Sequence, residues 1–291
     1  MKLDRIELAD CTTPTSLVQA ILKQIPDLSI PVPIEEVALA LDIVQIEEVA
    51  TDSFEGCLVT FKDKSEGTIL FNSRNTRQRK RFTIGHELGH FLNPWHLPID
   101  GDRFLCSSRD MTRSEAAKGN RAAQMEVEAN RFSAELLMPD RHFRKDLRAF
   151  GGPELAHIIE LARRYDMSKE ATARRYVDLH DEACAVVISK NGSILYKHPG
   201  KEFPYITANR GQPLPNGSMS KTYREDEGVV SSWVEVKNYV WLSDTGSNVS
   251  SLMEQTLRQQ NGFQMTLLYA ELSDEDDADN DDLTERWTPR F

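Results

Sequence analysis

The pentapeptide His86-Glu87-Leu88-Gly89-His90 constrains this chain more than any other feature of its sequence. On a helix it places two imidazoles four residues apart on one face, about 6 Å along the axis. That spacing allows both rings to bind one tetrahedral ion, normally Zn²⁺, while the carboxylate between them can take a proton from a water at the open coordination position. Apolar neighbours such as Phe82, Ile84 and Phe91 favour a buried helix over 76–92.

A catalytic zinc normally has a third protein ligand, and a second helix, predicted over 114–138, offers candidates for it. The apolar stripe of that helix leaves Glu126 and Glu128 on opposite sides, so periodicity does not choose between them. The neighbours favour Glu126, because its side continues with residues that suit a cleft, whereas Glu128 lies among charged residues typical of a solvated face. We predict Glu126 as the ligand and Asn130 as a residue that orients a metal-binding histidine. His96 is an alternative ligand that we expect to remain unligated.

The pattern along the rest of the chain predicts an α+β fold, with a small sheet beside the helix that carries the histidines. The stretch 93–112 contains Pro94, Pro98 and Gly101, and we expect it to be irregular. The predicted helices cover 15–25, 34–41, 76–92, 114–138, 153–165 and 168–180, and the predicted strands cover 43–49, 56–61, 67–71, 183–189, 193–196, 231–242 and 263–272.

A change in composition near residue 182 divides the chain. We predict a metal-binding domain at 1–141, a helical segment at 142–182 similar to a helix-turn-helix, and a β-rich C-terminal module at 183–272. An acidic tail follows at 273–291, and its composition is typical of disorder.

The net charge of −11 does not by itself indicate a nucleic-acid partner or exclude one. Nine acidic residues lie between Glu271 and Glu285, and the remainder of the chain is close to neutral. We interpret the basic run at 77–81 as the solvated first turn of a helix. The helix pair at 153–180 carries several arginines and leaves contact with DNA or a partner open.

The cysteines and the apolar runs bear on the compartment. Cys11, Cys57, Cys106 and Cys184 are far apart in the sequence, so we expect reduced thiols and no disulfide framework. No apolar run is long enough to span a membrane, and the first residues lack the apolar core of a signal peptide. These observations predict a cytoplasmic protein without a membrane partner.

Two segments, RKRFTIGHELGHFL at 79–92 and EVEANRFSAELLMP at 126–139, together resemble the ImmA/IrrE family of zinc metallopeptidases. The resemblance extends over roughly 15–180 and implies a zincin-like peptidase domain. In that family the metal ligands are the two histidines of the pentapeptide and a glutamate upstream of the LLMP run, a position that corresponds to Glu126 here. Gly85 stands where the family commonly has alanine.

The resemblance also implies an activity and a partner. Zn²⁺ would be held by His86, His90 and Glu126, with Glu87 as general base, and Mn²⁺ or Fe²⁺ also suit such a donor set. Tyr176 and Arg175 are candidates for stabilising the transition state. Family members cut helix-turn-helix repressors, often in stress responses, so the expected substrate is a repressor encoded nearby.

Two other functions remain open at this point. The chain could be a ligand- or DNA-binding transcriptional regulator whose metal domain is mainly structural. It could also be an antitoxin-like component that binds a partner protein.

Overall fold

The chain folds into two compact units that each contain helices and a sheet, which confirms the predicted α+β class. The first unit comprises residues 1–143 and 160–172, and the second comprises 144–159 and the residues from 173 onward. The computed structural model describes residues 1–97, 103–107, 110, 119–243 and 248–273.

The first unit contains a four-stranded sheet in the order β1-β3-β2-β4. Strand β1 (Ile43–Val49) pairs in parallel with β3 (Gly67–Asn72), and β2 (Gly56–Thr60) pairs antiparallel with β3. The three strands predicted before the helix are therefore present. Strand β4 (Arg103–Cys106) pairs antiparallel with β2 and corrects the expectation that 93–112 is irregular throughout. Its four residues are too few to show an alternating pattern, and pairing with β2 supplies its backbone hydrogen bonds.

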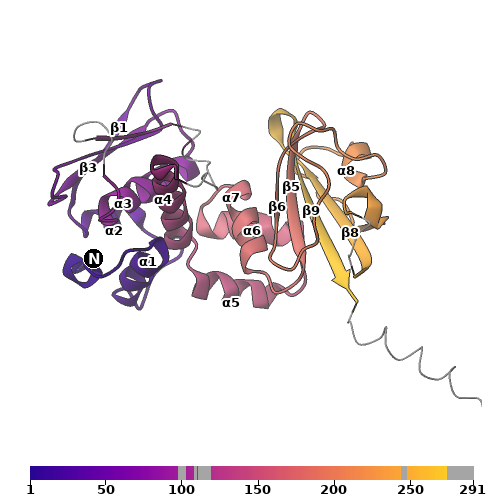
Figure 1. Cartoon of the computed structure of the whole chain (residues 1–291), viewed down its shortest axis with the longest axis horizontal. Helices are drawn as coiled ribbons and strands as arrows, with labels where there is room; N and C mark the ends of the chain where they lie inside the picture. The colour runs from indigo at the N-terminus through magenta and orange to yellow at the C-terminus, as the bar shows by residue number, and fades with distance from the viewer. Residues whose placement is uncertain (98–102, 108–109, 111–118, 244–247, 274–291) are drawn as a thin grey trace, which may run out of the picture. The chain divides into compact units, whose positions relative to one another are not determined.

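The helix that carries the pentapeptide, α3 (Arg77–Leu92), packs on β2 and β3 and against α4 (Arg121–Leu137) (Figure 1). Helix α1 (Pro14–Lys23) covers α4, and α2 (Ile34–Leu39) covers α3. The side chain of Thr76 accepts a hydrogen bond from the backbone of Arg79 and so caps the first turn of α3.

Helix α4 begins later than its predicted start at Ser114. Asn120 is its N-cap and accepts a hydrogen bond from the backbone of Ala123, and Gly119 before it has a φ of +85° that does not continue a helix. The predicted first turns at 114–118 lie outside the described residues.

Helices α5, α6 and α7 follow α4 directly. Helix α5 (Asp140–Phe150) starts directly after Pro139, where the sequence pattern indicates only a helix stop. Helices α6 (Leu155–Tyr165) and α7 (Lys169–Leu179) agree with the predicted pair, and Asp166 adopts a φ of +51° in the turn between them.

The second unit is built around a five-stranded antiparallel sheet in the order β6-β5-β9-β8-β7. Two outcomes differ from the prediction. The strand expected over 231–242 is reduced to β7 and a short 3-10 helix, and β8 was not indicated because Glu254, Gln255 and Thr256 interrupt its apolar pattern. The strands are β5 (Cys184–Lys190), β6 (Ser193–Pro199), β7 (Val234–Val236), β8 (Val249–Arg258) and β9 (Phe263–Leu272).

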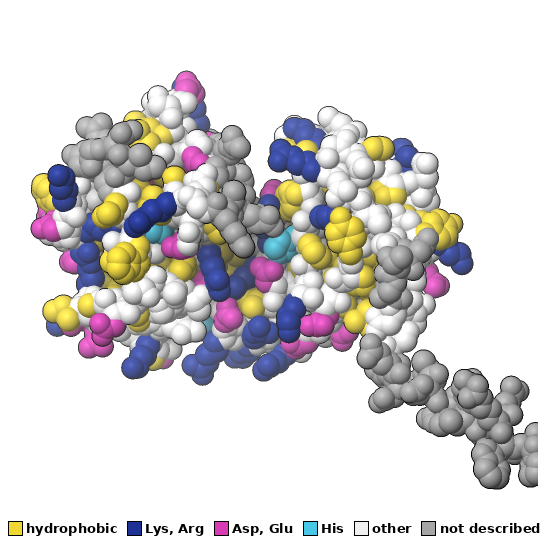
Figure 2. Space-filling view, in the orientation of Figure 1, with side chains coloured by type: hydrophobic (Ala, Val, Ile, Leu, Met, Phe, Trp, Pro, Cys, Tyr) yellow, Lys and Arg dark blue, Asp and Glu magenta, His cyan; other side chains and the backbone are white. Residues whose placement is uncertain are grey.

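The surface of the first unit carries mixed charge. On the face shown in Figure 2, hydrophobic side chains lie between basic and acidic ones. Within the described part of the chain, no helix is both long enough and apolar enough to cross a membrane. The predicted acidic tail lies outside the described residues apart from Ser273.

Candidate metal centre

Two glycines bring α3 and α4 unusually close together. A Cβ atom at Gly85 would lie 2.6 Å from the Ser133 hydroxyl oxygen, and one at Gly89 would lie 3.0 Å from Cδ1 of Phe132. Ser133 in turn donates a hydrogen bond of 2.8 Å to the carbonyl oxygen of Phe82. The glycines therefore let the polar side chains of α4 reach the histidines of α3.

Four potential ligand atoms converge between α3, α4 and β4. The Nε2 atoms of His86 and His90 are 3.1 Å apart. One carboxylate oxygen of Glu126 lies 3.3 Å from His86 Nε2, and the other lies 3.4 Å from His90 Nε2. The thiol sulfur of Cys106 lies 3.9 Å from His90 Nε2, and all four donors lie within 4.8 Å of one another. The structure thus brings together the three predicted ligands and adds a cysteine.

These distances and surroundings fit a metal ion. Zinc bonds of about 2.0–2.1 Å to nitrogen or oxygen place tetrahedral ligands about 3.3 Å apart, close to the separations seen here. Oε2 of Glu126 and both carboxylate oxygens of Glu87 are buried without a hydrogen-bond partner among the described residues. Buried carboxylates without partners are costly, and a divalent cation would neutralise them.

Burial and the neighbouring side chains shift the pKa values of the site. Burial raises the pKa of Glu87 well above its ordinary range, and the neighbouring charge of Glu126 adds to this shift while the nearby Cys106 thiol opposes it. Burial likewise lowers the pKa of His90 to about 3. Burial also disfavours ionisation of Glu126, but its close contacts with His86 and His90 outweigh this effect and hold the pKa of Glu126 well below its usual range. His90 is thus neutral and able to act as a ligand.

The outer nitrogens of both histidines are hydrogen bonded. Asn130 Oδ1 lies 2.9 Å from His86 Nδ1, and the Asn130 amide donates to the carbonyl oxygen of Asp110 at 2.7 Å. His96 Nδ1 lies 3.0 Å from His90 Nδ1. This leaves the Nε2 atoms of His86 and His90 facing the ligand cluster, an arrangement common for metal-binding histidines.

Glu128 occupies a different environment from the one predicted. Rather than lying on a solvated face, it has one oxygen 3.0 Å from His96 Nε2 and the other 3.0 Å from the amide of Gln124. Arg131, the expected neighbour for an ion pair, bonds Glu135 instead. The prediction failed because His96 lies on a loop, and the periodicity of α4 gives no information about where that loop packs.

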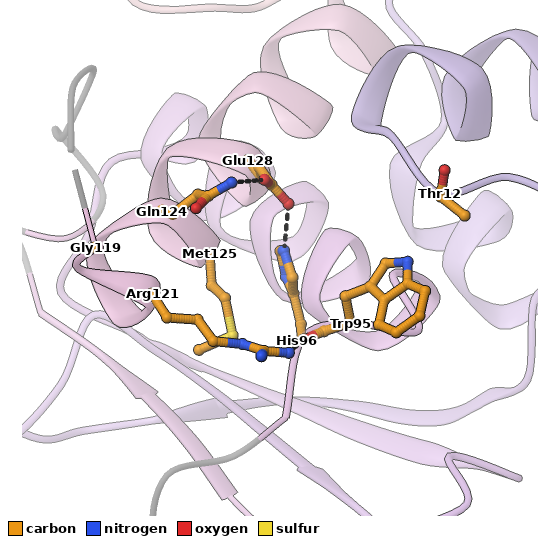
Figure 3. Close-up of a pocket in the computed structure, with 8 residues that line it drawn as sticks. All are labelled: Thr12, Trp95, His96, Gly119, Arg121, Gln124, Met125 and Glu128. Carbon is orange, nitrogen blue, oxygen red and sulfur yellow. Dashed lines mark hydrogen bonds and ion pairs between the residues drawn. The ribbon is translucent and has the colours of Figure 1, made fainter. Parts of the chain in front are cut away.

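A cleft of about 470 Å³ opens beside the contact between His96 and Glu128. In Figure 3, His96 points toward Glu128, with Trp95 on one side and Met125 and Arg121 on the other. Trp95 is 58% exposed, and its carbonyl oxygen accepts a hydrogen bond from Arg121. The cleft is large enough to accept a side chain of a partner molecule.

Two predicted residues belong to the second unit. Tyr176 is buried there, and its hydroxyl accepts a hydrogen bond of 3.0 Å from the backbone of Glu154. Burial raises the pKa of this hydroxyl. Arg175 is also largely buried in that unit. Their suggested role in catalysis stays a prediction.

The basic run at the start of α3 is occupied by contacts within the chain. Arg77 and Arg81 both contact the carboxylate of Asp166, at 2.6 and 3.5 Å. Lys80 bonds Glu48 on β1 at 2.8 Å. These acidic partners reduce the positive field that a nucleic acid would meet.

The fold and the site form a candidate metal-binding domain, with the helix of the pentapeptide set against a second helix and a small sheet. Residues 44–176 match the model of the IrrE N-terminal-like domain, and this match supports the assignment to the ImmA/IrrE family. The predicted family resemblance is therefore correct.

Two individual proteins show how far the similarity extends. Over 107 residues the chain is 34% identical to the radiation response metalloprotease IrrE of Deinococcus radiodurans, a match that covers 36% of this chain and 29% of that protein. The structure is similar to that of a Mycobacterium tuberculosis transcriptional regulator, with a TM-score of 0.55 and 13% identity over 91% of this chain and 79% of the other. The second similarity concerns the fold alone.

Proposed function

We propose that this protein is a site-specific zinc metallopeptidase that cuts one peptide bond in a partner protein. The observation that carries the proposal is the convergence of His86, His90 and Glu126 beside the buried carboxylate of Glu87, which has no hydrogen-bond partner among the described residues. The family assignment supports it independently. A zinc site with a purely structural role has no use for such an acid next to its ligands, whereas a catalytic site needs a general base there.

Each residue of the site has a definite task in this proposal. His86, His90 and Glu126 would hold the ion, which when bound supplies positive charge to polarise the scissile carbonyl and acidify a water. Glu87 takes the proton of the attacking water and returns it to the leaving amine.

The surrounding contacts keep the ligands in place. Asn130 accepts a hydrogen bond from His86, and His96 accepts one from His90 while Glu128 accepts one from His96. This assignment leaves both Nε2 atoms free of protons. We expect these contacts to raise the basicity of the ligating nitrogens and to fix the orientation of both rings.

We infer from the family that the substrate is a helix-turn-helix repressor encoded beside the gene and that its cleavage relieves repression. A peptidase active inside a cell must be selective, since broad cleavage would be toxic. We therefore expect little activity on an unfolded protein such as casein.

Co-expression of the full-length protein with that neighbouring repressor tests the proposal. The wild type should yield one discrete fragment, whose ends mass spectrometry defines, and Glu87→Gln should reduce the rate by about 10²- to 10⁴-fold while zinc content is unchanged. Glu47→Gln, an exposed glutamate on β1, is the matched control and should leave cleavage intact. Unchanged regulation by Glu87→Gln would contradict a peptidase and favour a binding regulator.

A further inference from the structure

Cys106 is a buried thiol that none of the proposed hydrolytic steps uses. It is the last residue of β4 and is only 1% exposed. Its backbone is fixed by pairing with Gly56 on β2, and its carbonyl oxygen accepts a hydrogen bond of 2.9 Å from Glu55. The position of the thiol therefore follows from the sheet.

The sulfur lies where a fourth ligand would lie. A Zn–S bond of about 2.3 Å and a Zn–N bond of about 2.05 Å separate tetrahedral sulfur and nitrogen ligands by roughly 3.6 Å. The observed distance from Cys106 Sγ to His90 Nε2 is 3.9 Å, and the sulfur also belongs to the four-donor cluster with His86 and Glu126. Small shifts would complete a closed His₂GluCys site.

A thiol must lose its proton to bind zinc, so ligation of Cys106 releases one proton.

We propose that Cys106 binds the metal as a fourth protein ligand and holds the site in a closed resting state. On ligation the S–H bond breaks, a sulfur–metal bond forms, and the proton leaves to solvent. Opening reverses these changes, because the sulfur takes up a proton from solvent as it leaves the metal and frees the coordination position. The inference rests on the proposed metal site and requires no particular substrate.

Cobalt substitution of the full-length protein reports directly on the ligands. Co²⁺ bound by a thiolate has a charge-transfer absorption in the near ultraviolet that nitrogen and oxygen ligands do not produce. We expect this band in the wild type and its loss in Cys106→Ala with one cobalt still bound. Cys57→Ala is the matched control, because Cys57 is also buried and lies on β2 next to the residue that pairs with Cys106.

Two further measurements complete the test. Zinc affinity, measured by competition with a chelator, should fall in Cys106→Ala by at least the roughly 10- to 100-fold that loss of an outer hydrogen-bond partner costs. Cleavage by Cys106→Ala, measured at saturating zinc, should exceed that of the wild type, because the open position no longer has a competing ligand. Cys106→Ser preserves the side-chain volume and serves if the alanine variant fails to fold.

The possible results separate the two proposals. Stoichiometric cobalt binding without a thiolate band in the wild type overturns the role of Cys106 and leaves the proposed peptidase intact. Failure of the wild type to bind cobalt or zinc at all overturns the metal site itself. A thiolate band that persists in Cys106→Ala assigns the sulfur ligand to another cysteine and also overturns the inference.

Discussion

Glu87 in the first unit and Glu254 in the second are both 0% exposed, but their surroundings are opposite. The carboxylate of Glu254 accepts hydrogen bonds from the backbones of Met219 and Ser220, at 3.1 and 2.7 Å, and from the indole of Trp241 at 2.9 Å. Glu87 has no such donors in the described structure. Burial alone therefore does not reveal the role of an acid. One whose hydrogen bonds are complete stabilises the fold, and one without them is available for chemistry.

The largest expected effect on stability concerns Glu254. In Glu254→Gln the new side-chain N–H group faces N–H donors that now bond the carboxylate. We therefore expect the free energy of unfolding of the second unit to fall by about 3 kcal/mol. Urea unfolding of the metal-free protein, followed by tryptophan fluorescence, measures the change. A loss below about 1 kcal/mol would contradict the stabilising role that we assign to Glu254 and not to Glu87.

The outer contacts of the metal centre should have the next largest effect. His96→Ala removes the acceptor for His90 Nδ1, and we expect zinc affinity to fall by about 10- to 100-fold. Competition with a chromophoric chelator measures this directly. His198→Ala, whose ring contacts Asp178 in the second unit, is the control and should bind zinc as the wild type does. Equal affinities for both variants would show that His96 does not position a ligand.

Glu87 should behave differently from Glu254 when the metal is removed. Because the folded-state pKa of Glu87 is raised, the native wild type retains a proton that the unfolded chain releases above about pH 4.3. The wild type therefore loses stability relative to Glu87→Gln as the pH rises from about 4 to neutrality, where we expect the variant to be more stable by about 1 kcal/mol or more.

The measurement is the difference in unfolding free energy between these two proteins in a chelator over that pH range. A difference that stays constant with pH would show that Glu87 is solvated or paired in solution.

The smallest effect concerns the helix contact that encloses Glu87. Gly85→Ala gains helix propensity but places a methyl group 2.6 Å from the Ser133 hydroxyl oxygen, and we expect a net loss of about 1 kcal/mol. Adding Gly85→Ala to a Ser133→Ala background should cost less than it does in the wild type. Thermal unfolding of the four proteins in this double-mutant cycle measures the coupling, and strict additivity would contradict the contact.

Local patterns explain what could be predicted for the two units. The strands β1, β2 and β3 and the helix α3 were evident because their apolar periods and caps are contained in a few consecutive residues. Strand β4 was missed because four residues carry no period, and β8 was missed because the buried polar residue Glu254 finds its partners in α8 (Met219–Thr222) and Trp241, far away in sequence. The role of Glu128 was missed for the same reason, because its partner His96 lies far away in the sequence.

The sequence by itself determined the pentapeptide helix, the α+β class and the family resemblance, because a four-residue spacing on a helix and two short motifs are local properties. Only the tertiary structure decided that His96 and Glu128 support His90, and that Cys106 reaches the ligand cluster. These contacts join a loop, a helix and an edge strand. Their proximity depends on how the helices pack and how the strands pair, which no single segment of the sequence encodes.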